Sequence, residues 1–163
     1  MPNVISNTSP LQYLYQANLL DLLPQIYHSI VVPQSVNREL EQGRILGVFL
    51  PVLTSLSWID IITVEFTTAI PDDEKLGPGE KEVIALAQSQ PDALVLLDDG
   101  LARVRAKQLG IELTGTLGVI LKAKKLGYVK EVKPILDRLD ELGFRASLVT
   151  RKAILKAAEE MDN

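Results

Sequence analysis

The 163-residue sequence contains no cysteine and only one histidine, His28. The lack of cysteine excludes disulfide bonds, thiolate nucleophiles and zinc sites built on cysteine. It also fits a reducing compartment, so we expect a cytoplasmic protein. His28 lies just before a predicted strand, where a turn residue explains it better than a catalytic role does. Any metal site in this chain must therefore rely on oxygen ligands.

The sequence also lacks a long apolar run. The longest, ILGVFLPVL at residues 45–53, contains Gly47 and Pro51 and is far too short to cross a bilayer. The first ten residues, MPNVISNTSP, have no basic segment in front of an apolar one, so we expect no signal peptide. Together these absences predict a protein that does not associate with membranes.

Charge is distributed unevenly along the chain. Residues 1–102 contain 13 acidic and 4 basic residues, whereas residues 103–163 contain 8 acidic and 13 basic ones. The overall net charge of −4 therefore combines −9 in the first part with +5 in the second. An acidic part joined to a basic part is typical of a cation site beside a surface for polyanions, and equally of charge scattered over solvated helices.

The order of the predicted elements indicates one α/β domain over residues 1–163, which is long enough to bury a core. Strands that alternate with helices predict a mainly parallel sheet. We expect a core over residues 3–126, a helical extension over 127–163 and a loop at 71–79. The expected strands are 3–6, 30–32, 60–64, 93–97 and 111–113. The expected helices are 9–23, 33–42 (opened by Pro33), 80–90, 100–109, 116–126, 133–142 and 148–161.

Oxygen-rich turns follow three of these strands. They contain Asn7, Thr8 and Ser9, then Asp98 and Asp99, then Thr114 and Thr116. Because parallel strands end at one edge of a sheet, we expect these side chains to meet there. The predicted helices add Glu39 beside core positions, and Glu80 at the head of an apolar stripe with Glu82 two residues later.

The adjacent carboxylates Asp98 and Asp99 have three possible explanations: a helix cap, a salt bridge or a shared cation. Two like charges a few ångströms apart repel by about 1 kcal/mol in water. A divalent ion between them reverses that interaction, and an oxygen-only ligand set suits Mg²⁺ or Mn²⁺. Capping explains either aspartate or Ser9 equally well. Glu80 is favourable at a helix N-terminus without any metal, and Glu39 alone is typical of a solvated helix.

Five short motifs are similar to those of PIN-domain proteins in their order and spacing. They are VISNTSPL, VPQSVNREL, LGPGEKEVIALA, LLDDGLARVRAKQLG and TGTLGVILKAKKLG, which lie between residues 4 and 127, and the resemblance runs from about residue 3 to residue 150. The chain most resembles a branch related to VapC-type toxins of prokaryotic toxin–antitoxin modules. This resemblance implies a PIN-like three-layer α/β/α fold with extra C-terminal helices and metal-dependent cleavage of RNA. It also implies Mg²⁺ or Mn²⁺ as the cofactor, a small antitoxin as a partner, and a possible homodimer.

The resemblance also assigns roles to individual residues. The metal positions of the family fall on Asn7, Glu39, Glu80, Asp98 and Asp99, and the catalytic ones on the four acids among them. The sequence does not separate Asp98 from Asp99, or Glu80 from the nearby Glu82, as the main ligand. Supporting positions fall on Ser9, Glu82 and Thr116. Asn7 departs from the family pattern, which has aspartate there, since an amide brings no charge and accepts no proton. The alternative to a ribonuclease is therefore a PIN-fold module with little or no activity that acts through protein or RNA partners.

Basic residues follow the acid pair. Arg103, Arg105 and Lys107 are the residues we expect to contact an RNA backbone, which would make binding dependent on salt. Arg103 lies so close to the acid pair that a salt bridge and a phosphate contact are equally good explanations. The apolar stretch 45–53 or the C-terminal helices offer a dimer contact, although ordinary core is the favoured interpretation.

Overall fold

Five strands form the centre of the molecule in the computed structural model, which describes residues 3–65 and 75–161. They are β1 (Val4–Ser6), β2 (Ile30–Pro33), β3 (Ile59–Ile62), β4 (Leu94–Leu96) and β5 (Glu112–Thr114). The order across the sheet is β3-β2-β1-β4-β5, and every strand pair in it is parallel. The predicted α/β class with a parallel sheet is confirmed.

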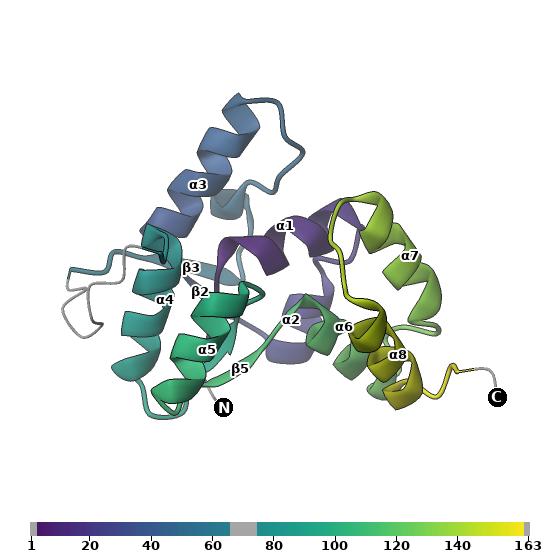
Figure 1. Ribbon diagram of the computed structural model, residues 1–163. Helices are drawn as coiled ribbons and strands as arrows, with labels where there is room; N and C mark the ends of the chain where they lie inside the picture. The colour runs from purple at the N-terminus through teal and green to yellow at the C-terminus, as the bar shows by residue number, and fades with distance from the viewer. Residues whose placement is uncertain (1–2, 66–74, 162–163) are drawn as a thin grey trace.

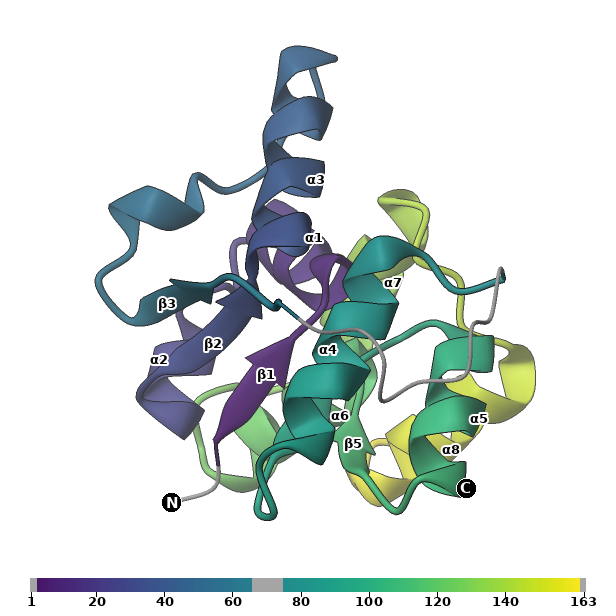
Figure 2. The ribbon, with the colours of Figure 1, turned by 90° about the vertical axis from the view of Figure 1, so that its left-hand side faces the viewer.

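Helices cover both faces of this sheet. They are α1 (Thr8–Gln16), α2 (Leu22–Tyr27), α3 (Gln34–Ile45), α4 (Pro78–Gln88), α5 (Gly100–Gln108), α6 (Thr116–Lys125), α7 (Lys133–Glu141) and α8 (Leu148–Ala157). A short 3-10 turn, η1, spans Leu53–Ser55. In Figure 2, α4 and α5 lie in front of the sheet, while α2 and α6 lie behind it. In Figure 1, α3 projects from the carboxyl edge, and α7 and α8 form a lobe at one side.

The central strands are buried on both faces, which explains their continuous apolar sequence. Ile5 of β1 pairs with Val31 on one side and with Val95 on the other, and both Ile5 and Val95 have no exposed surface. On α4 the predicted apolar stripe at Val83, Ile84 and Ala87 is buried against β1, β2 and β4. The sheet and α4 thus give the carboxyl edge a rigid base.

Several predicted boundaries are wrong for local reasons. The single helix at 9–23 is two helices, because Asn18 adopts a left-handed conformation (φ 59°) that asparagine tolerates. Pro33 does not open α3 but ends β2, with an extended backbone at ψ 150°. Helix α8 ends at Ala157 instead of residue 161, and Glu159 beyond it has φ 60°. The other elements shift by one or two residues. The predicted loop at 71–79 lies in part outside the described residues.

Only part of the apolar stretch 45–53 belongs to the core. Leu50 and Leu53 are buried, but Ile45, Leu46 and Phe49 are 83%, 82% and 62% exposed. These residues lie at the end of α3 and in the loop after it, away from the sheet.

None of the described helices is long and apolar enough to cross a membrane.

Candidate active site at the carboxyl ends of the strands

Two neighbouring strands deliver the first polar residues to the carboxyl edge. Asn7 follows β1, and its backbone N–H donates to the carbonyl of Leu96 over 3.0 Å, which continues the pairing of β1 with β4. Asp98 follows β4 after Leu97, whose N–H donates to the carbonyl of Thr114 over 2.8 Å. The ladder therefore fixes the backbone up to the residues that carry the candidate chemistry.

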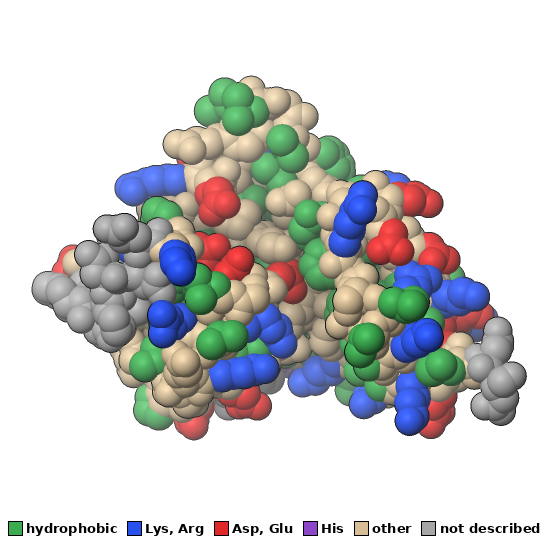
Figure 3. All heavy atoms as spheres, viewed as in Figure 1, with side chains coloured by type: hydrophobic (Ala, Val, Ile, Leu, Met, Phe, Trp, Pro, Cys, Tyr) green, Lys and Arg blue, Asp and Glu red, His purple; other side chains and the backbone are tan. Residues whose placement is uncertain are grey.

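A hollow of about 370 Å³ lies at this edge. Its polar lining includes Asn7, Thr8, Ser9, Glu39, Glu80, Asp98 and Asp99, so the structure brings together all five predicted metal positions. Figure 3 shows acidic side chains gathered in the depression between the α4–α5 side and the α7–α8 lobe. Glu82, a predicted supporting residue, does not line this hollow.

Asp98 is held by three hydrogen bonds from two elements. Its Oδ1 accepts from the Thr116 N–H over 2.7 Å. Its Oδ2 accepts from the hydroxyls of Thr116 over 2.6 Å and of Ser9 over 2.8 Å. Ser9 and Thr116 thus both hold Asp98, and their role as supporting residues of an active site stays a prediction. The alternative explanation of Ser9 as a helix cap is wrong, because α1 starts at Thr8 with Asn7 as its N-cap and Ser9 lies inside the first turn.

Asp99 is the N-cap of α5. Its Oδ2 accepts from the Ala102 N–H over 2.9 Å, which confirms the capping explanation for this member of the pair. The side chain is exposed and still lines the hollow. One carboxylate oxygen of Asp99 is therefore used by the helix, and the other faces the candidate site without a hydrogen-bond donor among the described residues.

Glu39 reaches the hollow from α3, although the residue is exposed. Its Oε2 accepts from the Thr8 hydroxyl over 2.8 Å, which ties α3 to the turn after β1. Gly79 of α4 packs closely against Asn7 and lies near Glu39. A Cβ at Gly79 would lie 3.0 Å from Asn7 Oδ1 and 3.6 Å from Glu39 Oε2. A side chain at Gly79 would press on Asn7, whereas its distance to Glu39 would be an ordinary contact.

The structure separates Glu80 from Glu82. Glu80 lies in the first turn of α4 and lines the hollow. Its Oε2 lies 2.6 Å from the position of a Cβ on Gly77, so the carboxylate is folded over the N-terminus of α4, where the helix dipole favours an anion. Glu82 instead has a buried Oε2 with no hydrogen-bond partner. We find no function for that oxygen.

The donor set fits a hard divalent cation. Asn7 is 5% exposed, and its Oδ1 is buried with no hydrogen-bond partner. An unsatisfied buried carbonyl costs about 1–3 kcal/mol, and a bound cation would remove that penalty. All the other candidate ligands are carboxylates, as Mg²⁺ and Mn²⁺ prefer. As the described side chains stand, no three acidic residues are close enough together to enclose an ion.

The three predicted RNA-contacting residues differ in position. Arg103 lies beside the site and donates from Nη1 to the carbonyl of Leu97 over 2.8 Å. It forms no ion pair with either aspartate, so the salt-bridge explanation is wrong. Arg105 and Lys107 lie further along α5, and neither lines the hollow.

The sequence patterns missed the contribution of the C-terminal part of the chain. Gly143, Phe144 and Arg145, between α7 and α8, also line the hollow, as do Gln12 and Tyr13 of α1. No local motif marks them. The only available signal was the net positive charge of residues 103–163, which is too coarse to select Arg145.

Comparison with known proteins agrees with this arrangement. No curated protein matches the chain. A family model described as a PIN domain matches residues 3–160, which is nearly the whole sequence and includes α7 and α8. The resemblance to the PIN family is therefore confirmed, while the toxin-related branch stays a prediction. The chain belongs to the PIN-domain family, whose members are generally nucleases.

Proposed function

We propose that the protein is a metal-dependent endoribonuclease that cleaves single-stranded RNA. The observation that carries this proposal is the meeting of four carboxylates and the unsatisfied Asn7 oxygen in one hollow at the carboxyl edge. Ligands bind at this edge in parallel α/β sheets. Membership of a nuclease-type family supplies the class of reaction.

Asn7, Glu39, Glu80, Asp98 and Asp99 would hold one or two Mg²⁺ or Mn²⁺ ions. A bound ion would polarise the scissile phosphate and lower the pKa of a water molecule. The chain itself contributes orientation: Ser9 and Thr116 hold Asp98, and Thr8 holds Glu39.

Glu80 is the proposed proton acceptor. Its carboxylate lines the hollow and takes part in no hydrogen bond with a described residue. It would accept the proton of the attacking water as the new bond to phosphorus forms. The bond from phosphorus to the 3′ oxygen then breaks, and that oxygen takes up a proton. The expected products are a 5′-phosphate and a 3′-hydroxyl.

The proposal extends to the biological setting. By the resemblance, the ribonuclease would be the toxin of a toxin–antitoxin module in the cytoplasm, with a small antitoxin as its partner. The exposed apolar residues Ile45, Leu46 and Phe49 at the end of α3 support a homodimer, because such patches usually mark protein contacts.

A binding module without efficient catalysis is the second candidate. One observation favours it: Asn7 replaces the first carboxylate, so the site has one charge fewer than the family pattern. In this case the hollow would still bind RNA or a protein segment but would not activate water.

The test is cleavage of a labelled mixed-sequence RNA with Mn²⁺, Mg²⁺ or EDTA. Wild type and Asp99→Asn are purified side by side to exclude a contaminating nuclease. Asparagine keeps the cap of α5 but removes the charge. Metal-dependent cleavage by the wild type that is lost in the variant supports the ribonuclease. No cleavage by folded wild type in either metal supports the binding module.

A further inference from the structure

A second hollow adjoins the acidic one. It measures about 540 Å³ and shares Asp98, Phe144 and Arg145 with its neighbour. One wall comes from α5, the end of β5 and the start of α6, and the other comes from residues 144–150 and α8. The two hollows thus adjoin at these three residues, and we call them together the Asp98 groove.

Two glycines of the Asp98 groove leave room for neighbouring side chains against the backbone. A Cβ at Gly115 would lie 2.6 Å from Asp98 Oδ1 and 3.0 Å from Arg103 Nη1. A Cβ at Gly118 would lie 2.0 Å from the Thr114 hydroxyl oxygen. Because these glycines carry no Cβ, the Asp98 carboxylate and the Arg103 guanidinium both pack against the backbone at Gly115, and both residues line the second hollow. A cation therefore stands next to the acidic hollow without forming an ion pair with Asp98.

Arg145 is the second cation of the Asp98 groove, and it lines both hollows. It is exposed and makes no hydrogen bond or ion pair with any described residue. Other cations nearby are engaged: Arg151 pairs with Asp137 and with Asp140. An arginine left without a partner beside a negatively charged hollow is available to bind an anion that enters it.

The segment that carries Arg145 is fixed to the rest of the protein. The ring of Phe144 packs edge-to-face on Tyr13 of α1, with 5.0 Å between the centroids. Beyond it, Arg151 ties α8 to α7 through two aspartates. The backbone at Arg145 is therefore held at a defined place, and Arg145 and Arg103 line the same hollow.

We propose that Arg145 and Arg103 form a phosphate subsite that guides single-stranded RNA through the Asp98 groove. This inference rests on the proposed function. The phosphate next to the scissile one would lie between the two guanidinium groups, each of which can donate two parallel hydrogen bonds to phosphate oxygens. The apolar side chains of Leu117, Phe144 and Ile154 line the same hollow and suit a sugar or a base. The helical extension thus completes the substrate path.

The experiment measures binding and cleavage separately. Fluorescence anisotropy with a labelled single-stranded RNA in EDTA gives the Kd of wild type, Arg145→Ala and Lys152→Ala over a series of salt concentrations. Lys152 is the matched control, because it is an exposed cation of the same extension that lines neither hollow. Cleavage rates in Mn²⁺ then give kcat and KM for the same proteins.

Arg145→Ala is expected to weaken binding about tenfold, as the loss of one charged hydrogen-bond contact does. The slope of log affinity against log salt should fall by about 0.7, which is the value for one phosphate contact on a single strand. KM should rise with little change in kcat, while Lys152→Ala resembles wild type. The melting temperature should not change, because Arg145 has no partner to lose.

Two results would overturn the subsite. If wild type cleaves RNA but Arg145→Ala keeps its affinity and salt slope, the phosphate subsite is wrong and the ribonuclease stands. The same holds if Lys152→Ala weakens binding as much as Arg145→Ala, since the effect is then one of overall charge. If folded wild type neither binds nor cleaves RNA, both proposals fail.

Discussion

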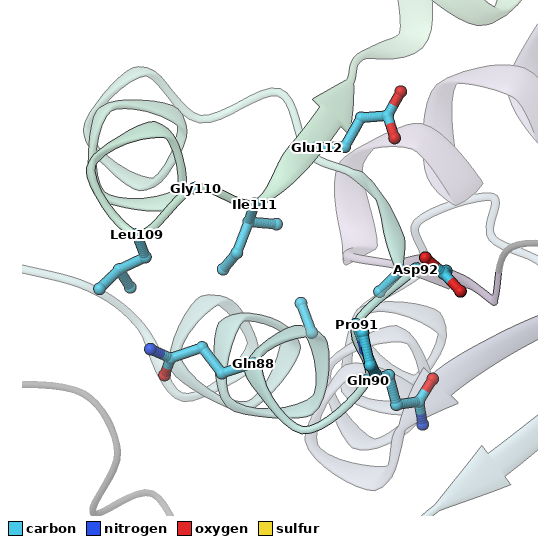
Figure 4. A pocket seen from close by; sticks show the side chains of 10 residues that line it. Gln88, Gln90, Pro91, Asp92, Leu109, Gly110, Ile111 and Glu112 are labelled. Atoms are coloured by element: carbon cyan, nitrogen blue, oxygen red, sulfur yellow. The ribbon is translucent and has the colours of Figure 1, made fainter.

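The amino and carboxyl edges of the same sheet each carry a hollow, and the two differ in chemistry. The hollow at the amino edge, at the start of β4 and β5, is the larger at about 720 Å³. Figure 4 shows that its polar side chains, Gln88, Gln90, Asp92 and Glu112, point in different directions. The hollow at the carboxyl edge measures about 370 Å³ but gathers four carboxylates and Asn7. The candidate site is distinguished by the oxygen ligands that lie together in it, and not by the volume of its hollow.

Chain direction explains this difference. Parallel strands run into helix N-termini at the carboxyl edge, where the turns need residues with side-chain oxygens such as Asp99. At the amino edge helices end, and their turns need residues that stop a helix. Gly110, with φ 72°, follows the end of α5 in the left-handed conformation typical of that position. The residues at the amino edge thus serve to end helices.

The largest expected effect is on RNA cleavage, when one carboxylate charge is removed at the carboxyl edge and, for comparison, at the amino edge. Glu39→Gln should lower RNA cleavage by about a hundredfold or more, because a ligand and its charge are lost from the site. Asp92→Asn at the amino edge should leave the rate unchanged. Both residues are exposed, so folding should survive, and circular dichroism checks it. If the two variants cleave RNA at equal rates, the carboxyl edge is no more important for cleavage than the amino edge.

Asn7→Asp tests the carboxyl edge in the opposite way, because it adds a charge to the site. The new carboxylate would complete the acid set beside Glu39, so we expect metal-dependent cleavage to rise about tenfold. In EDTA the added like charge should lower the free energy of unfolding by about 1 kcal/mol. Rate assays and urea unfolding measure the two effects. A variant with unchanged activity in both metals would place Asn7 outside the metal set.

Gly79 at the start of α4 is closely packed, whereas Gly100 at the start of α5 borders open space, so an added methyl group should act differently at the two positions. Gly79→Ala puts a Cβ 3.0 Å from Asn7 Oδ1 and 3.3 Å from Val36 Cγ2, so the side chain of Asn7 must move. We expect cleavage to fall about tenfold, with a change in stability of only about 1 kcal/mol. Gly100→Ala on α5 is the control, since nothing lies within 4 Å of its Cβ position. If both variants cleave at the wild-type rate, the approach of α4 does not shape the site.

The smallest effect concerns the C-terminal extension, which lines the hollow at the carboxyl edge and not the one at the amino edge. The Glu160 carboxylate accepts from Lys124 Nζ over 2.7 Å and from the N–H groups of Val132 and Lys133 over 2.7 and 3.0 Å. Burial raises the pKa of Glu160, but these hydrogen bonds outweigh it and leave the pKa below the ordinary value of 4.5. The stability that Glu160 contributes is therefore present above its ordinary pKa and is lost as the pH falls through the folded-state pKa.

Glu160→Gln should lower the free energy of unfolding at neutral pH by about 1–2 kcal/mol, and by less in acid, where the wild-type carboxyl is also neutral. Urea unfolding at both pH values measures this. Glu159→Gln is the control, because Glu159 is exposed and has no hydrogen bond from its side chain to a described residue. A loss that does not depend on pH would show that the charge of Glu160 does not matter.

Local pattern and the parallel arrangement were enough to predict most of the fold and the meeting of the acids. Alternation of apolar strands and helices gave the sheet, and each strand then led to the polar residues that follow it. The helix break at Asn18 was missed because it depends on one residue in a left-handed conformation. The different roles of Asp98 and Asp99, which are adjacent in one turn, were harder still to predict. Only their bonding partners show that Asp98 is held from two sides while Asp99 caps a helix.

Long-range packing set the remaining features. Phe144 and Arg145 follow Asp98 by more than forty residues and reach the site only because Phe144 packs on Tyr13. The choice between Glu80 and Glu82 depended on the rotation of α4 against the sheet, since both lie on a helix that is apolar on most sides. The apolar stretch 45–53 was expected in the core, yet the end of α3 extends beyond the sheet and exposes Ile45 and Leu46.

Calorimetric titration with Mn²⁺ tests most directly whether the carboxyl edge is a divalent-cation site. Wild type, Glu39→Gln and Asp92→Asn are titrated without RNA, so binding is measured apart from cleavage. We predict that wild type and Asp92→Asn bind Mn²⁺ equally well and that Glu39→Gln binds it about tenfold more weakly or not at all. A folded wild type that binds no Mn²⁺, or a Glu39→Gln variant that binds it as wild type does, would contradict the account.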